Sequence, residues 1–160
     1  MSDFSGPGAY MLFPLHAAGQ CLDVSHRSTA SGTKVILHSP NGPGLEHQLW
    51  EIVGAGGNAG DSEVGDNQYH LLAAHSGRML CAPENGLLGT CMTASRSIRH
   101  SSTRWKIAPA GKGAFYIMSV GGANLALAID QGKKNPGSDL VVTTKVEAAH
   151  FQFELKLPNF

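Results

Sequence analysis

The sequence predicts an all-β domain built from three repeats of four short strands. Apolar runs of about four to seven residues, rich in β-branched and aromatic side chains, alternate with Gly- and Pro-containing turns along the chain. No segment repeats its apolar residues at the spacing of an amphipathic helix. A phrase of one aromatic, one charged and one aliphatic residue occurs three times, at Trp50-Glu51-Ile52, Trp105-Lys106-Ile107 and Phe153-Glu154-Leu155.

Each repeat follows the same order of elements. The first strands begin at Tyr10, Tyr69 and Tyr116. The second strands are expected at 21–24, 79–82 and 125–128, and the third at 32–39, 89–96 and 137–144. The fourth strand carries the aromatic phrase. The repeats therefore span about 10–55, 69–110 and 116–157 of a single domain that we expect to occupy residues 1–160.

The repeated aromatic residues indicate how the units pack. Four short strands cannot bury their apolar side alone, whereas three copies share one core and close the edges of the sheet. We therefore expect Trp50, Trp105 and Phe153 at equivalent buried positions.

Composition argues against several classes of partner. Lys+Arg and Asp+Glu are both 12, and this balance argues against nucleic acid or an anionic membrane as the partner. No apolar run is long enough to cross a membrane. The first residues do not read as a secretion signal, and an odd number of cysteines fits a reducing compartment, so we expect a cytoplasmic location. Cys81 and Cys91 could lie on adjacent strands, which leaves a disulfide between them open.

The first repeat is the most informative. Its elements GQCLDV, GTKVILHS and HQLW resemble those of the ricin B-chain-like β-trefoil lectins, also called QxW domains, and nearly the whole chain follows the pattern. Because we find no secretion signal, the chain resembles the cytosolic fungal members of this family. The resemblance implies a β-trefoil with pseudo-threefold symmetry that binds glycans ending in galactose or N-acetylgalactosamine.

Binding a neutral sugar requires a carboxylate for adjacent hydroxyls, a flat ring against the apolar face, and amide or imidazole groups that complete the hydrogen bonding. By resemblance, Asp23 is the sugar-binding carboxylate, His38 stands where the family has its stacking aromatic, and His47 stands at its hydroxyl-binding Asn. Gln48 is either a ligand or a bridge between strands, and Asn41 and Gly42 belong to a turn that we expect to wall the pocket. Since imidazole titrates near pH 6.5, we expect sugar binding to change between about pH 5 and 7.

The other two repeats lack this set. The second is expected to place Cys81, Ser95 and Ser102-Thr103 at these positions, and the third Ala126, Thr143 and His150-Phe151. Neither retains the carboxylate, so we expect one working site, in the first repeat. One weak site gains avidity from a second copy, which leads us to expect a homodimer.

Other functions are less well supported. The motifs of common hydrolases, phosphate-binding loops and clustered metal ligands are absent from the sequence, so we expect neither an enzyme nor a metal or cofactor. The main alternative is a protease inhibitor that acts through the loops at 54–68 and 83–89, as similar fungal β-trefoils do. A scaffold of the actin-bundling trefoil kind would be expected to have basic patches or tandem domains.

Overall fold

A computed structural model of the chain describes residues 2–42, 45–56, 68–84 and 88–158. The strands of the first unit are β1 (Gly8–Pro14), β2 (Cys21–Val24), β3 (Thr33–His38) and β4 (Trp50–Gly54). Those of the second are β5 (Gln68–Ala73), β6 (Met79–Cys81), β7 (Gly89–Thr90), β8 (Met92–Ala94) and β9 (Trp105–Gly111). The third unit contains β10 (Ala114–Ser119), β11 (Leu125–Ile129), β12 (Leu140–Thr144) and β13 (Phe153–Lys156).

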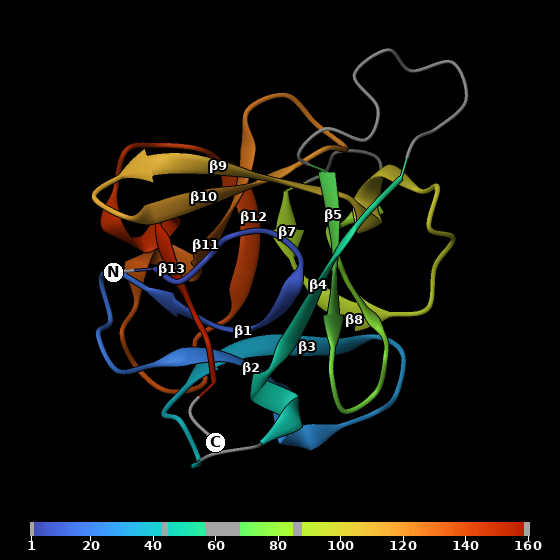
Figure 1. Ribbon diagram of the computed structural model, residues 1–160, viewed down its shortest axis with the longest axis horizontal. Helices are drawn as coiled ribbons and strands as arrows, with labels where there is room; N and C mark the ends of the chain where they lie inside the picture. Colours follow the sequence, from blue (N-terminus) through green and yellow to red (C-terminus); the bar gives the residue numbers. More distant parts are fainter. Residues whose placement is uncertain (1, 43–44, 57–67, 85–87, 159–160) are drawn as a thin grey trace.

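Six of these strands form a closed barrel (Figure 1). Antiparallel pairing runs from β1 to β4, β5, β9, β10 and β13, and β13 pairs with β1 again. Closure leaves none of these six strands with an open edge. Each unit contributes its first and last strand to the barrel, as the repeat pattern predicts.

The inner strands of each unit form hairpins that cover one end of the barrel. The hairpins are β2–β3, β6–β8 and β11–β12. They are joined to one another, because β3 pairs with β8, β7 pairs with β12, and a bridge links Ile36 to Asp139. This arrangement of a six-stranded barrel and three cap hairpins is the β-trefoil fold that the repeats and the resemblance predict.

Two of the three repeated aromatic residues link the barrel to this cap by hydrogen bonds. Trp50, Trp105 and Phe153 each begin the last strand of their unit and are fully buried, as predicted. The indole Nε1 of Trp50 donates to the carbonyl of Leu22 at 3.3 Å, and that of Trp105 donates to Leu80 at 3.0 Å. The residue after each of these carbonyls is therefore held at a fixed place in the cap.

An aromatic ring from outside the repeats, which the repeat pattern did not reveal, packs against the first strand of each unit. Phe4 lies with its ring centroid 5.5 Å from Tyr10, 5.9 Å from Tyr69 and 5.3 Å from Phe115, one ring from each unit. The prediction that Tyr116 begins the third unit in the same way was wrong by one residue. A shift in register between Ala114 and Phe115 moves Phe115 to the inner position.

The third strand of the second unit also differs from its prediction. Residues 89–96 were expected to form one strand, but pairing is interrupted at Cys91. The break lets β7 pair with β12 while β8 pairs with β3 and β6. Cys21, Cys81 and Cys91 are all free thiols, and burial raises the pKa of Cys21 to about 12. The thiols of all three therefore stay protonated at neutral pH, since burial also raises the pKa of Cys81 and Cys91.

In the described part of the chain, no helix has both the length and the apolar character needed to cross a membrane.

The Phe4 ring is expected to stabilise the barrel although its segment lies outside the repeats. Replacing half-buried Phe4 by Ala removes three edge-to-face or tilted ring contacts, and should lower the free energy of unfolding by about 2 kcal/mol. Urea unfolding measures this, with Leu157→Ala as control because Leu157 is 55% exposed. Equal stability of the two variants would contradict the assigned role.

Candidate functional site

A polar pocket of about 230 Å³ lies on the cap hairpin of the first unit. It is bounded by the end of β2, the 3₁₀ turn η1 (Ser25–Arg27), the end of β3 and the 3₁₀ turn η2 (Glu46–Gln48). Its lining residues are Asp23, Ser25, His26, Arg27, Ile36, His38, Asn41 and His47. The pocket thus gathers Asp23, His38, Asn41 and His47 of the six residues predicted from the sequence.

Asp23 is a buried carboxylate that a neighbouring amide holds in place. It is 4% exposed, and its Oδ2 accepts a hydrogen bond of 2.8 Å from Nε2 of Gln48. Among the hydrogen bonds and ion pairs of the described residues, those of this carboxylate use Oδ2, which leaves Oδ1 to a ligand. A buried carboxylate oriented in this way is a strong acceptor for hydroxyl groups.

Gln48 does not itself line the pocket. Its amide also donates to the carbonyl of Ser39 at 2.9 Å, and its Oε1 accepts from the backbone N–H of Asn41 at 3.0 Å. The side chain is fully buried. The sequence left two roles open for Gln48, a ligand and a bridge between strands, and this geometry matches the bridge. The Gln48 side chain holds both Asp23 and the turn that follows β3.

His47 completes the floor of the pocket. It is 4% exposed, and its Nε2 lies 3.4 Å from Asp23 Oδ2 and 3.5 Å from Nδ2 of Asn41. Burial lowers the pKa of His47 below its usual value; the Asp23 carboxylate opposes this shift, while nearby Arg27, His75 and His38 add to it. At neutral pH the ring is therefore uncharged and can exchange hydrogen bonds with a polar ligand.

His38 and the turn after it form one wall. The Nδ1–H of His38 can donate to the Ser39 carbonyl at 2.9 Å, which orients the ring. Asn41 lines the pocket, whereas Gly42 does not. Gly42 borders a separate hollow of about 680 Å³ together with Phe13, Pro40 and Lys156. Contrary to the expectation from the sequence, Gly42 therefore lines a different hollow from Asn41.

Sequence reasoning missed four lining residues: Ser25, His26, Arg27 and Ile36. Ile36 is found once β2 and β3 are paired, because it lies directly opposite Asp23. His26 and Arg27 both have left-handed backbone conformations, with φ of 55° and 54°. Two consecutive residues other than glycine in the left-handed region of backbone conformation are uncommon. No sequence pattern predicted them.

Strand pairing also corrects how the other units align with the first. Asp23 pairs with Ile36, as Cys81 pairs with Met92 and Ala128 with Val141. Gln131 has the left-handed conformation of His26 and follows Ala128 by three residues, as His26 follows Asp23. The third-unit counterpart of Asp23 is therefore Ala128 and not Ala126.

The counterpart of His38 changes for the same reason. His38 pairs with Cys21, two residues before Asp23, while Ala94 pairs with Met79, two residues before Cys81. The second unit therefore presents Ala94 and not Ser95. Thr143, which pairs with Ala126, keeps its predicted place in the third unit.

In the second unit an arginine occupies the region that corresponds to the pocket. Nη1 of Arg96 donates to the carbonyl of Ala82 at 3.0 Å and to the hydroxyl of Ser102 at 2.8 Å. Ser102 is the counterpart of His47, because the turn η4 (Ser101–Thr103) corresponds to η2. The guanidinium thus binds the Ser102 hydroxyl, whose counterpart His47 lines the first-unit pocket.

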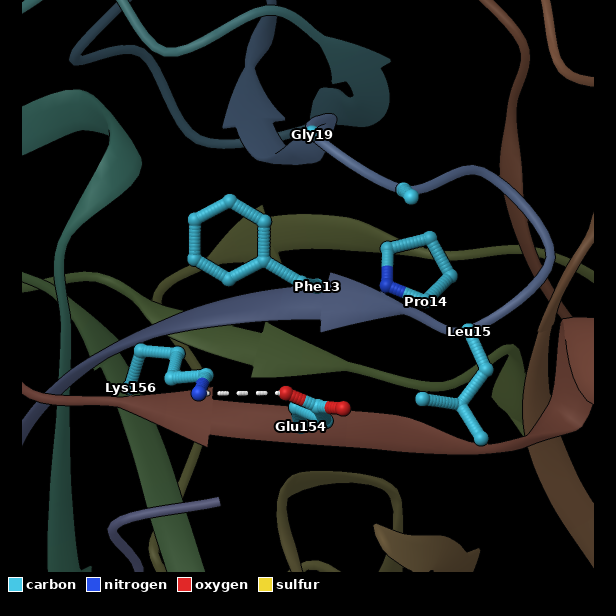
Figure 2. Close-up of a pocket in the computed structure, with 7 residues that line it drawn as sticks. Phe13, Pro14, Leu15, Gly19, Glu154 and Lys156 are labelled. Atoms are coloured by element: carbon cyan, nitrogen blue, oxygen red, sulfur yellow. Dashed lines mark ion pairs between the residues drawn. The ribbon is translucent and has the colours of Figure 1, made fainter. Parts of the chain in front are cut away.

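A different hollow, of about 260 Å³, lies between β1 and β13 (Figure 2). Phe13, Pro14 and Leu15 provide its apolar side, and on β13 the side chains of Lys156 and Glu154 form an ion pair of 3.2 Å. Since these charges neutralise each other, the hollow lacks the converging polar groups of the first-unit pocket. Among the described residues, no group of three or more His, Cys, Asp and Glu is placed to hold a metal ion.

Comparison with known proteins identifies the type of domain. Residues 46–143 match the family model described as ricin-type β-trefoil lectin domain-like. No curated protein sequence matches the chain.

Solved structures share the fold. A designed threefold-symmetric protein, ThreeFoil, is 25% identical with a TM-score of 0.78, covering 92% of this chain and 96% of its own. The ricin B-like lectin of Macrolepiota procera, solved with lactose, is 20% identical with a TM-score of 0.71, covering 98% and 100%. The C-terminal half of an earthworm R-type lectin, solved with GalNAc, is 16% identical with a TM-score of 0.67, covering 93% and 98%.

Three histidines with lowered pKa values predict how the free energy of unfolding changes with pH. Burial lowers the pKa of His47, His70 and His150 in the folded chain, while the unfolded chain titrates near pH 6.5. Below about pH 6.5 the unfolded state therefore binds more protons, and the free energy of unfolding falls as pH falls toward the folded pKa values. The melting temperature should be lower at pH 5 than at pH 7.

His70→Gln provides the control. Nδ1 of His70 lies 2.9 Å from the carbonyl of Thr103, and a Gln amide can donate there without titrating. The variant should lose less stability than the wild type between pH 7 and pH 5. A melting temperature that is the same or higher at pH 5 in the wild type would refute the assignment.

Proposed function

The chain belongs to the family of ricin-type β-trefoil lectin-like domains, and we propose that it is a lectin that binds glycans ending in galactose or N-acetylgalactosamine through its first unit. The observation that carries the proposal is the buried Asp23 carboxylate, oriented by Gln48 and facing a pocket with His38, Asn41 and His47. The proposed function is binding without catalysis.

The chemistry of the pocket supports a sugar ligand. Adjacent hydroxyls of a hexose donate to Asp23 and accept from the neutral imidazole of His47 and the amide of Asn41. The imidazole of His38, held by Ser39, offers a flat face to the C–H side of the ring. Lactose and GalNAc are the ligands in two solved lectins of this fold, which supports the galactose type.

Differences among the units support a single site. The positions of Asp23, His38 and His47 are held by Cys81, Ala94 and Ser102 in the second unit, and by Ala128, Thr143 and His150 in the third. Neither set includes a carboxylate, and Arg96 takes up hydrogen-bonding groups in the second.

A glycan array with wild type and Asp23→Ala tests the function. The wild type should bind glycans ending in galactose or N-acetylgalactosamine, and the variant should lose at least tenfold in affinity, since a charge-assisted hydrogen bond contributes about 1.5–3 kcal/mol. Asp130→Ala, which removes a carboxylate from the third unit, is the matched control and should bind normally.

Two other outcomes are informative when the thermal unfolding of each protein confirms folding. Binding that survives in Asp23→Ala would place the site outside the first unit. Absence of binding by the folded wild type would refute the lectin proposal and direct attention to a protease panel. The loops proposed for protease inhibition, 54–68 and 83–89, lie largely outside the described residues.

We also propose that the protein acts as a homodimer in the cytoplasm. A single shallow site for a monosaccharide corresponds to a Kd of about 1 mM, or about −4 kcal/mol, and two linked sites raise the avidity on a glycosylated surface. Light scattering should give twice the mass of one chain at micromolar concentration. A mass equal to one chain would refute the dimer and leave the proposed sugar site untouched.

A further inference from the structure

Arg27 stands where the backbone favours glycine. Its φ is 54°, in the left-handed region that costs free energy for a residue with a Cβ. The corresponding turn of the third unit, η5 (Asp130–Gly132), follows Ile129 as η1 follows Val24, and its last residue is Gly132, with φ of 64°. The first unit thus keeps a long cationic side chain at a position that the same fold elsewhere fills with glycine.

The side chain of Arg27 borders the proposed sugar pocket. It is one of the lining residues, and its charge helps to keep the neighbouring His47 imidazole neutral. Arg27 is exposed, and within the described part of the chain no carboxylate forms an ion pair with it. Its guanidinium is therefore available to a ligand.

The charges that line the pocket also favour a ligand with an anionic group. Asp23 already receives the Gln48 amide on one oxygen, whereas the guanidinium of Arg27 carries hydrogen-bond donors and no acceptor. A neutral hexose uses the carboxylate but gives the guanidinium no partner of opposite charge.

We infer that the preferred ligand is a galactose-type sugar carrying an anionic group, a sulfate or a carboxylate, which Arg27 binds while Asp23 binds the ring hydroxyls. This inference rests on the proposed function and adds the class of sugar to it. A planar guanidinium donates two parallel hydrogen bonds to either anionic group, so the shared chemistry is the anionic oxygen pair. Binding of an anionic group by Arg27 would account for a residue other than glycine at this strained position of the pocket lining.

The test compares lactose, sulfated lactose and sialylated lactose by titration calorimetry at neutral pH. Wild type should bind at least one of the anionic sugars about tenfold more tightly than lactose, and the preference should fall as salt is added. The sulfated and sialylated arms separate the two sources of the anionic group.

Arg27→Gly removes the guanidinium and gives the backbone the residue that suits it, so the melting temperature should be no lower than that of wild type. In this variant the ratio of anionic to neutral affinity should fall to about one. Lys112→Gly is the matched control: Lys112 is an exposed cation with φ of 53° in the β9–β10 hairpin, away from the pocket lining, and its loss should keep the preference.

The results distinguish failure of this inference from failure of the proposed function. Wild type that binds lactose with no preference for the anionic sugars, or a preference that persists in Arg27→Gly, overturns the inference and leaves the lectin proposal standing. A preference lost equally in Lys112→Gly also overturns it, because the effect would then be one of net charge. Folded wild type that binds none of the sugars refutes the proposed function and this inference together.

Discussion

The hydrogen bond from the Trp50 indole to the carbonyl of Leu22 links the barrel to the cap, and the geometry of the pocket depends on it. Trp50 begins a barrel strand that pairs on both sides, so its position is set by the closed sheet. Leu22 lies in the cap hairpin directly before Asp23. Because the Trp50 indole is fixed by the barrel, its hydrogen bond to Leu22 also fixes the position of the adjoining Asp23 carboxylate. Trp105 makes the same bond to Leu80, which precedes Cys81. The hydrogen bond from barrel to cap is thus common to the two units. They differ in the residue that follows the bonded carbonyl, which is Asp23 in the first unit and Cys81 in the second.

A buried carboxylate imposes a second constraint. Asp23 would be costly at 4% exposure without a donor, and Gln48 supplies it from the turn that immediately precedes Trp50. The same amide binds Ser39 and Asn41, so the carboxylate and the wall of the pocket are positioned together. In the second unit, Thr103 replaces Gln48 and donates to the carbonyl of His100 at 2.8 Å. The second unit thus lacks both the carboxylate and the amide that binds it. We expect the two to occur together, because either one alone would leave a buried polar group without a hydrogen-bond partner.

Most of the fold could be predicted from sequence because it depends on spacing. The strand order and the three buried aromatic residues follow from patterns that repeat. The errors arise where one residue changes the register. A shift at Ala114 moves the inner aromatic to Phe115, and pairing places Ala128 and Ala94 where counting along the chain placed Ala126 and Ser95. Phe4 was missed because it fills the barrel from outside the repeats. Arg27 was missed because its importance lies in a backbone angle, and sequence spacing carries no information about φ.

Because the fold has pseudo-threefold symmetry, the same position can be compared in three units that pack in the same way. Features shared by the units, such as the buried aromatic that begins the last strand, are explained by the barrel and need no function. Features confined to one unit at a cost in stability need a different explanation. Asp23 is buried charge where the other units have Cys81 and Ala128, and Arg27 is strained where the third unit has Gly132. Folding would favour the alternatives at both positions. Both departures border the same pocket, one carrying negative and the other positive charge, so the proposed ligand with hydroxyl and anionic groups would account for both.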